Sequence, residues 1–505
     1  MSSFFRFIFA GLFVSILGPL FPQSLYATVK FELTILHNND IHSKYKNIPR
    51  LITSVRQMKT VYPNTLMLNA GDTFQGSLLY NFYKGKLASH FLNQLQPDAI
   101  CLGNHEFDDG IEVLGEFLKS LKVPVVSSNI VFDDQKLQNF ILPSLVVERG
   151  GVKIGIIGVI TPNTATCAGG GGDAKFLDVL PSVQNQIKIL KDQGSEIVIL
   201  LSHVGLEEDI KIAREVDGID LIVGGHSHSL LSNCILDALP YPIVENSPNG
   251  DKVLVVTAYK HNEYLGRLSL SFENGALHSW EGDLIPINDD IPEDIEFAAD
   301  LASFSNKLPF ESSLVGETNL DLSNEGCREV ECNLGSLTAD ALYWYAQGLG
   351  AVDIALVNGG TFRSGISTGA IRSQDFLEVF PFDDLVSIIE IEGSVLLEFL
   401  ERTLVPRNPE GDLMHISGGV YEWDDAREEG DKILSFRLNE KEPFDPLKKY
   451  IVVLPTFVKK KCLLAPYKDV RKHRDHVVIR DIVKDYAVRL SPIVKLGTGR
   501  IIKRG

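Results

Sequence analysis

Short apolar runs recur along the first half of the chain, and this recurrence restricts the fold more than any other feature. The runs are rich in Val, Ile and Leu and cover Phe31–His37, Thr65–Asn69, Ala99–Leu102, Lys153–Ile160, Ile197–Leu201 and Leu221–Val223. Stretches with the period of amphipathic helices lie between them, at Asn47–Val61 and Val183–Gln193. This alternation is typical of parallel strands that are covered on both faces. We therefore expect an α/β domain whose strands are buried by crossover helices.

The chain has 505 residues, which predicts two domains because a single core rarely grows so large. Residues 289–314 begin with acidic side chains and continue with a helical pattern, so they are predicted to connect the domains. The second α/β region has predicted strands at Asp353–Val357, Val386–Ile391 and Tyr450–Leu454, and predicted helices at Leu334–Gln347 and Ser394–Thr403.

The charge balance disfavours some classes of partner. The net charge of −18, from 48 basic and 66 acidic residues, repels a nucleic acid polymer and anionic lipid. If the substrate is an anion, local positive charge must overcome this background, and bound metal ions are one source of it.

The N-terminus reads as a secretory signal. Arg6 precedes an apolar run, Ile8–Leu20, that is short for a membrane span, and Ala27 is a plausible cleavage point. The C-terminal Ile501–Gly505 has no hydrophobic tail, so a lipid anchor is not expected. We expect a secreted protein without a membrane anchor. If the chain is bacterial, it would be periplasmic.

Six cysteines in a secreted chain permit disulfides. Cys327 and Cys332 enclose four residues and are a candidate for a small local loop. The other cysteines are equally consistent with buried free thiols.

Metal-capable side chains follow five of the N-terminal apolar runs. They lie in the segments His37–His42, Asn69–Asp72, Gly103–Asp108, Ser202–Gly205 and Gly224–His228. In an open parallel sheet the carboxyl ends of strands face one crevice, so these segments are predicted to meet. One such His is usually structural, but five converging sets of Asp, Asn and His indicate bound metal. The donors are nitrogen and oxygen without thiolate, which fits Zn, Mn, Fe, Co or Mg rather than an iron–sulfur cluster.

The ordered set of motifs resembles a known family. Asp40-x-His42, Gly71-Asp72, Gly103-Asn104-His105-Glu106, His203 and Gly225-His226-Ser227-His228 resemble the calcineurin-like metallophosphoesterase domain. Asn358–Arg363 and Pro381-Phe382 resemble the C-terminal domain of the 5′-nucleotidase family, which includes ecto-5′-nucleotidases, salivary apyrases and bacterial UDP-sugar hydrolases. The resemblance spans roughly residues 30–460.

The resemblance implies a fold and its boundaries. It implies an N-terminal four-layer α/β/β/α metallophosphoesterase domain and a C-terminal α/β 5′-nucleotidase domain that binds substrate. Together with the sequence pattern, we predict a signal peptide at 1–27, the first domain at 28–288, a linker helix at 289–314 and the second domain at 315–505.

The resemblance also implies residue roles. Asp40, His42 and His228 would hold one divalent ion, Asn104, His203 and His226 a second, and Asp72 would bridge them. His105 and Asp108 would form a catalytic dyad, although Asp108 is also placed to cap a helix. The implied cofactor is a pair of divalent ions, with zinc expected and Mn, Co, Mg or Ca as alternatives. Two such ions neutralise phosphoryl charge and lower the pKa of a bound water to about 7.

The substrate side is implied by the same resemblance. Arg328, Asn358 and Arg363 would contact phosphate and ribose, and Phe382 and Phe457 would sandwich the base. The resemblance also implies a Cys327–Cys332 disulfide loop, as in animal members. One departure concerns the ribose. The family has a Gly-Gly-Asp-Gly turn after the strand that precedes Phe457, whereas this chain reads Lys459–Pro466 without an Asp.

These patterns predict a secreted, dinuclear-metal nucleotide phosphohydrolase that converts AMP to adenosine. A soluble apyrase that hydrolyses ATP and ADP is the main alternative, since both activities use one metal site. A non-catalytic nucleotide-binding protein is disfavoured by the complete ligand set. The sequence leaves the nucleotide preference, the metal and the oligomeric state open.

Overall fold

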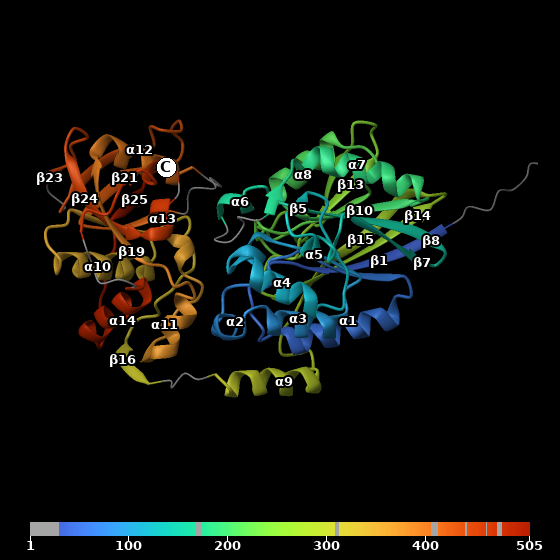
Figure 1. The fold of residues 1–505 in the computed structure, drawn as a ribbon, viewed down its shortest axis with the longest axis horizontal. Helices are drawn as coiled ribbons and strands as arrows, with labels where there is room; N and C mark the ends of the chain where they lie inside the picture. The colour runs from blue at the N-terminus through green and yellow to red at the C-terminus, as the bar shows by residue number, and fades with distance from the viewer. Residues whose placement is uncertain are drawn as a thin grey trace, which may run out of the picture.

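The computed structural model describes residues 30–167, 174–308, 313–405, 413–439, 442–460, 462–471 and 477–504. The predicted signal peptide, residues 1–27, therefore lies outside the described residues. Figure 1 shows two α/β units side by side, with the first half of the chain in one and the last third in the other. The two-domain α/β prediction is confirmed.

Two mixed sheets form the first unit. One has the order β15-β14-β1-β2-β3-β4-β6, with parallel pairing from β1 to β6 and antiparallel pairing of β14 and β15. Its strands are β1 (Lys30–Asn38), β2 (Thr65–Asn69), β3 (Ala99–Cys101), β4 (Val125–Val126), β6 (Ile141–Leu142), β14 (Tyr264–Glu273) and β15 (Ala276–Pro286).

The other sheet has the order β12-β13-β11-β10-β8-β7, with antiparallel strands at its two edges. Its strands are β7 (Ser144–Arg149), β8 (Val152–Ile160), β10 (Ile197–His203), β11 (Leu221–Val223), β12 (Ile243–Asn246) and β13 (Lys252–Val256). A small two-stranded sheet pairs β5 (Ile130–Phe132) with β9 (Ala174–Phe176).

Helices cover the outer face of each sheet, so the first unit has four layers (Figure 1). The layer on the first sheet includes α1 (Ile48–Val61), α3 (Gly85–Leu95) and α4 (Gly110–Ser120), and α7 (Val179–Asp192) and α8 (Leu206–Glu215) cover the second. One hydrophobic core lies between the first sheet and its helices and contains Leu51 and Phe91 from the helices and Met67 from the sheet. A separate core joins the two sheets through residues such as Leu68 and Ile156. The predicted α/β/β/α architecture is confirmed.

The covering of the strands differs from the expectation drawn from the apolar runs alone. Each strand has helices on one face and the other sheet on the opposite face, rather than helices on both. The two longest strands, β14 and β15, were not predicted. In β14 buried and partly exposed residues alternate along most of the strand, and in β15 only Leu284 is buried, so no continuous apolar run marks either strand.

The two sheets approach each other closely at Gly158 on β8. A Cβ atom there would lie 2.1 Å from the carbonyl oxygen of Val126 on β4. The Ser128 amide donates to the Gly158 carbonyl at 2.7 Å across this contact. Glycine permits this approach because it has no side chain. As a result, the carboxyl ends of strands from both sheets lie near one another.

The connecting segment contains helix α9 (Ile295–Asn306), which packs on the first unit (Figure 1). His90 on α3 lies 2.8 Å from the Asp300 carboxylate and stacks on the Phe297 ring. Arg50 on α1 pairs with Asp289 at 2.9 Å. These contacts attach α9 to the N-terminal layers.

The second unit contains two four-stranded sheets, of order β19-β24-β17-β20 and β23-β22-β21-β25. The strands are β17 (Ile354–Asn358), β19 (Val386–Glu392), β20 (Met414–Ser417), β21 (Gly419–Trp423), β22 (Ile433–Leu438), β23 (Glu442–Pro443), β24 (Lys449–Pro455) and β25 (Ile501–Lys503). A two-stranded sheet pairs β16 (Leu314–Thr318) with β18 (Gly369–Arg372). The main helices are α10 (Asn333–Gln347), α11 (Ser373–Val379), α12 (Gly393–Thr403), α13 (Thr456–Lys460) and α14 (Ile479–Leu490).

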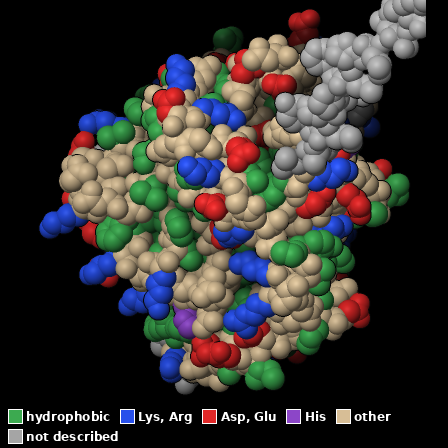
Figure 2. Space-filling model, turned by 90° about the vertical axis from the view of Figure 1, so that its right-hand side faces the viewer, with side chains coloured by type: hydrophobic (Ala, Val, Ile, Leu, Met, Phe, Trp, Pro, Cys, Tyr) green, Lys and Arg blue, Asp and Glu red, His purple; other side chains and the backbone are tan. Residues whose placement is uncertain are grey.

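The surface carries charges of both signs. Figure 2 views the end of the molecule remote from the second unit, where Lys, Arg, Asp and Glu side chains are interspersed and hydrophobic side chains form small groups between them. Within the residues that the structure describes, no helix is long and apolar enough to cross a membrane.

Candidate metal and substrate site

The five predicted strand ends converge as expected, although they come from two sheets. Asp40 and His42 follow β1, Asp72 follows β2, and Asn104 begins the short 3-10 helix η1 (Asn104–Phe107) after β3. His203 ends β10, while His226 and His228 follow β11 in the second sheet. Backbone bonds join the loops: the Asp40 amide donates to Gly71 O at 3.0 Å and the His42 amide to Asp72 O at 2.9 Å.

One cluster contains Asp40, His42 and His228. The Nε2 atoms of the two imidazoles lie 2.8 Å apart, and His228 Nε2 lies 3.5 Å from Asp40 Oδ1. Burial lowers the pKa of both His42 and His228, so their ring nitrogens favour the neutral form that binds metal. Nitrogen and carboxylate donors in this arrangement suit a divalent ion.

A second cluster contains Asp72, His203 and His226. His203 Nε2 lies 3.2 Å from Asp72 Oδ2, and His226 Nδ1 lies 2.8 Å from the Asn104 side-chain oxygen. His42 Nε2 is 3.8 Å from the same oxygen of Asp72, so this carboxylate lies between the two clusters. The structure therefore brings all seven predicted ligands together.

The bonding of His203 tests whether a metal fits. Its Nδ1 is 2.6 Å from the Ala70 carbonyl oxygen, so Nδ1 carries a proton and donates it. The buried Nε2 then directs a lone pair at the Asp72 carboxylate, where two acceptors face each other. Without a metal, burial is the largest single influence on the pKa of His203 and lowers it, but the charges of Asp72 and Asp40 and the hydrogen bonds to Asp72 and Ala70 together raise the pKa to about 10. A proton can therefore lie between His203 Nε2 and the Asp72 carboxylate. A divalent cation at the same place would be bound by both acceptors.

The backbone of the ligand loops is strained. Five of the seven predicted ligands have φ between 47° and 77°, in the left-handed region: Asp40, His42, Asp72, His226 and His228. Each such residue costs roughly 1–3 kcal/mol unless the surroundings fix it. Such strain concentrates at functional sites, which agrees with a metal centre here.

The predicted dyad forms. His105 Nδ1 lies 2.5 Å from Asp108 Oδ2. Burial alone would lower the pKa of His105, but the charges of Asp108 and Asp72 outweigh it and raise the pKa. Asp108 does not cap α4, which begins after Asp109. The contact with His105 therefore favours the predicted role of Asp108 as the partner of His105 over a role as a helix cap.

Glu106 is an important residue that the sequence analysis did not single out. Its buried carboxylate accepts the amides of Gly103 at 2.6 Å, Asp72 at 3.0 Å, and Thr73 and Phe74 at 2.7 and 3.0 Å. It thereby ties the loop after β2 to the loop after β3. The sequence feature that could have indicated this role is the acidic residue inside the motif Gly103-Asn104-His105-Glu106, which contains a predicted metal ligand.

A sixth strand end also reaches the site. The apolar run Val253–Val256 on β13 leads into a loop whose His261 amide donates to the Asp40 carbonyl at 2.8 Å. The His261 ring lies edge-on to His42, with centroids 5.8 Å apart. The sequence shows the same signal here as at the other five ends, an apolar run followed by polar residues, but this run was not among those identified.

Arg363 in the second unit faces the dyad. Its Nη2 lies 3.4 Å from His105 Nε2, and its guanidinium lies 5.2 Å from the centre of the Phe382 ring. Asn358 ends β17, and its side-chain oxygen accepts the Thr361 hydroxyl at 2.7 Å. The predicted phosphate-binding arginine is therefore next to the predicted catalytic histidine.

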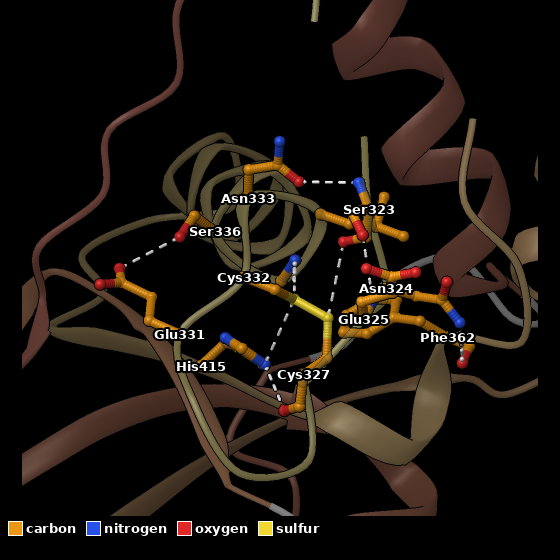
Figure 3. The surroundings of a disulfide bond; sticks show 12 residues. Ser323, Asn324, Glu325, Cys327, Glu331, Cys332, Asn333, Ser336, Phe362 and His415 are labelled. Carbon is orange, nitrogen blue, oxygen red and sulfur yellow. Dashed lines mark hydrogen bonds between the residues drawn. A yellow bond between two sulfur atoms is a disulfide. The ribbon is translucent and has the colours of Figure 1, made fainter. Parts of the chain in front are cut away.

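Arg328 belongs to a loop closed by the Cys327–Cys332 disulfide, which the structure contains. Figure 3 shows His415 next to the disulfide, where His415 Nε2 lies 2.9 Å from the Cys327 carbonyl oxygen. The loop packs directly on Gly359, where a Cβ atom would lie 2.0 Å from the same carbonyl oxygen. Arg328 and the Asn358 motif are thus fixed to each other by backbone packing.

The two predicted base-binding rings lie on adjacent segments. The Phe457 amide donates to the Asp384 carboxylate at 3.1 Å, and Asp384 is two residues after Phe382. The Phe457 side chain is 40% exposed, which is inconsistent with simple core packing. The segment with the altered sequence begins in helix α13 rather than in a turn, and its Lys459 pairs with Asp469 at 3.1 Å. Lys461 lies outside the described residues.

A buried cluster of Asp, His and Asn beside an arginine-lined substrate surface defines a class of protein, the metal-dependent phosphoester hydrolases. Comparison with protein families agrees. Residues 33–230 match the model for calcineurin-like phosphoesterases, and residues 314–463 match the model for the 5′-nucleotidase C-terminal domain.

Similar proteins narrow the class. The chain is 32% identical to the apyrase of Tabanus yao, covering 95% of each chain, and 33% identical to the 5′-nucleotidase of Homo sapiens, covering 85% of this chain and 83% of that one. The crystal structure of the 5′-nucleotidase precursor from Thermus thermophilus superposes with a TM-score of 0.87 at 31% identity, over 94% of this chain and 99% of that one. The chain belongs to the 5′-nucleotidase family, and the predicted family and enzyme class are confirmed.

Proposed function

We propose that this chain releases phosphate from nucleoside 5′-phosphates with the aid of two divalent ions, zinc being expected, and that it is secreted. The observation that carries the proposal is the pair of clusters joined by Asp72, in which buried acceptors face one another. Asp40, His42 and His228 would hold one ion, and Asn104, His203 and His226 the other. When bound, such ions neutralise phosphoryl charge and make a nucleophile available at neutral pH.

The residues of the chain supply the remaining functions. His105, oriented by Asp108, would hold a proton at Nε2 near the phosphoryl or leaving-group oxygen. Arg363 and Arg328 offer guanidinium donors to phosphate oxygens. Phe382 and Phe457 present ring faces for the base, and Asn358 would contact the substrate beside them.

Secretion is supported by the apolar N-terminal sequence and by relatives that include a snake venom 5′-nucleotidase of Naja atra, 32% identical over 94% of this chain and 98% of that one. The predicted boundary of the signal peptide, after residue 27, is tested by N-terminal sequencing of the protein recovered from culture medium. An intact Met1 on the recovered protein would contradict it.

The activity is tested by phosphate release from AMP, ADP, ATP and UDP-glucose, before and after treatment with a chelator. We expect activity that chelation abolishes and that zinc, manganese or cobalt restores. Activity that survives complete metal removal would contradict the metal role, and inactivity with every metal would contradict the enzymatic role.

A soluble apyrase is the second candidate. The specific observation in its favour is that the segment after Phe457 has lysines where the 5′-nucleotidase pattern has the ribose-binding Asp. The similarity to the Tabanus yao apyrase, over 95% of each chain, is consistent with this candidate.

A further inference from the structure

His415 is a fully buried histidine of the second unit that belongs to neither the predicted dyad nor the predicted metal clusters. It lies on β20, which pairs antiparallel with β17, so that His415 is opposite Val357 and Met414 is opposite Asn358. The strand therefore runs beside the one whose end carries a predicted substrate residue. A buried polar ring is costly unless it is hydrogen-bonded, so its partners indicate its role.

One partner of the imidazole is the backbone next to Arg328. His415 Nε2 lies 2.9 Å from the Cys327 carbonyl oxygen, which can only accept, so Nε2 carries a proton and donates it (Figure 3). The same nitrogen lies 3.7 Å from the Cys332 sulfur, at the other end of the disulfide. The Arg328 carbonyl accepts the amide of Leu413, the residue before β20, at 3.0 Å. The peptide groups on both sides of Arg328 are therefore bonded to the start of β20.

The imidazole also contacts the residue before Arg363. The rings of His415 and Phe362 meet at 65°, with centroids 5.9 Å apart, and Phe362 is itself buried. Arg363 follows directly. Its amide donates to the Val379 carbonyl at 3.0 Å, and its Nη2 lies 3.4 Å from His105 Nε2 in the other unit. One side chain thus contacts the residues that precede both predicted phosphate-binding arginines.

The position of the imidazole is itself fixed. A Cβ atom on Gly335, in the first turn of α10, would lie 2.3 Å from His415 Cγ, so the helix backbone packs directly on the ring. The Gly335 amide also donates to the Cys332 sulfur at 3.2 Å. The helix, the disulfide and the strand together leave the ring little freedom to turn. Its hydrogen bond to the Arg328 loop therefore keeps one geometry.

We propose, on the basis of the proposed function, that His415 is a positioning residue that holds Arg328 and Arg363 in the arrangement that binds the substrate phosphate. The two arginines come from segments far apart in the chain, and the contacts of His415 join these segments. Guanidinium groups bind a phosphate best when several donors point at it, so a shift of one loop by about 1 Å weakens binding. Since the His415 side chain is buried, it acts through these loops rather than by touching the substrate.

The loss variant is His415→Phe. Phenylalanine keeps a ring beside Phe362 but lacks the N–H that the Cys327 carbonyl accepts, so the Arg328 loop loses one buried hydrogen bond. We expect KM to rise about tenfold for each nucleotide that the wild type hydrolyses, with kcat within about threefold and metal content unchanged. If His415→Phe does not fold, His415→Asn replaces it, because its amide is too short to reach the Cys327 carbonyl.

His415→Gln is the conservative variant, because a Gln amide can donate from about the place of Nε2. Its KM should stay within about threefold of the wild-type value. The matched control is Ser417→Ala, since Ser417 lies on the same strand and donates to Asp340 Oδ1 on α10 at 2.7 Å. This variant also loses one hydrogen bond of β20, but we expect no rise in KM. A similar rise in Ser417→Ala and His415→Phe would reduce His415 to a structural residue and overturn the inference.

Trypsin tests the loop without turnover, since it cleaves after arginine and Arg328 is exposed. Native His415→Phe should be cut after Arg328 about tenfold faster than the wild type, because the loop opens more readily. Mass spectrometry after reduction measures the products, and Ser417→Ala should be cut at the wild-type rate. An unchanged KM, or a risen KM without faster cleavage, would contradict the positioning role. A wild-type protein that releases phosphate from no nucleotide contradicts the proposed function instead, and the cleavage rates then decide alone whether His415 holds the loop.

Discussion

The two units of this molecule prepare their parts of the site in different ways. In the N-terminal unit, the seven predicted ligands lie at the ends of strands or directly after them, the loops there are tied to one another by hydrogen bonds, and most of the ligands have a left-handed backbone. In the C-terminal unit, the predicted substrate residues are two arginines, two phenylalanines and Asn358, and one of the phenylalanines, Phe457, is 40% exposed. The Arg328 loop is closed by a disulfide rather than by strand ends.

This difference indicates that the first unit carries out the reaction and that the second unit selects the substrate. The metal cluster requires acceptors at fixed separations, so its loops are constrained from every side. The substrate surface must take up and release a nucleotide, so its rings and guanidinium groups remain accessible. Changes in the first unit should therefore abolish turnover, whereas changes in the second should mainly alter affinity.

The largest effect is expected for Asp72→Asn, which removes the charge shared by the two clusters. Loss of several kcal/mol of transition-state stabilisation should lower kcat by roughly a thousandfold or more. Metal content, measured by elemental analysis, should fall as well. Asp237→Asn is a matched control, since Asp237 is exposed and also has a left-handed backbone, with φ of 62°. Retention of full activity by Asp72→Asn would contradict the bridging role.

A smaller loss is expected for Asp108→Asn. His105 should lose the charge that orients it and raises its pKa, so kcat should fall about 10- to 100-fold with metal content unchanged. Because the pKa of His105 falls in the variant, the limb of the pH–rate profile that reports His105 should move to lower pH. A profile of unchanged shape would argue against His105 as the titrating group. The neighbouring Asp109→Asn is the control, because Asp109 bonds Tyr80 and Lys84 instead.

The substrate unit should respond through KM. Phe457→Ala removes one face of the predicted base sandwich, which is worth about 1–3 kcal/mol. We expect KM to rise about tenfold for adenine and uracil nucleotides alike, with kcat within about threefold. Phe82→Ala tests the specificity of this effect, since Phe82 is 44% exposed on α2 (Leu78–Tyr83) of the other unit. If Phe457→Ala lowered only kcat and left KM unchanged, the second unit would not act mainly on affinity, and the proposed difference between the two units would be wrong.

The smallest effect concerns stability. Asp209 on α8 is 1% exposed, and burial raises its pKa to about 7, above the usual value near 3.9 for an unfolded chain. Its protonated form therefore stabilises the fold fully below about pH 4, and this contribution is lost as the pH rises through about 7.

Asp209→Asn should remove that dependence. In chelator-treated protein, the variant should be more stable than wild type at pH 8 by about 1–3 kcal/mol, or several degrees in Tm, with a smaller difference at pH 5. Thermal unfolding followed by circular dichroism at both pH values measures this. A wild-type protein whose Tm relative to the variant does not change with pH would show that Asp209 titrates normally.

Much of the metal side could be predicted from the sequence. β2 (Thr65–Asn69) and β11 (Leu221–Val223) begin and end where the apolar runs predicted, because strands buried on both faces leave a continuous signal. Polar residues directly after such strands have few alternatives to binding a ligand at the sheet edge. The arrangement in two sheets came from the resemblance, since an apolar run does not show whether a helix or another sheet covers it.

The substrate side could not be predicted in the same way. Arg328 lies on a loop and Phe457 lies in the short helix α13, and neither segment has a periodic pattern, so only the family motifs indicated these residues. Glu106 and the loop around His261 were missed for another reason. Their importance comes from hydrogen bonds between segments far apart in the chain, such as the bond from His261 to Asp40, and no local pattern records such bonds.

The left-handed backbone at the ligand loops also limits how the sequence of this site can change. Asp, Asn and His are among the non-glycine residues that enter this conformation most readily. They are also side chains that provide oxygen and nitrogen to divalent ions. A β-branched or bulky replacement at His226 or His228 would destabilise the left-handed backbone of the loop, whether or not the new side chain could bind a metal. Exchange at these positions in a functional homologue should therefore stay within a very small set of amino acids, and any drift outside that set should accompany a rebuilt loop.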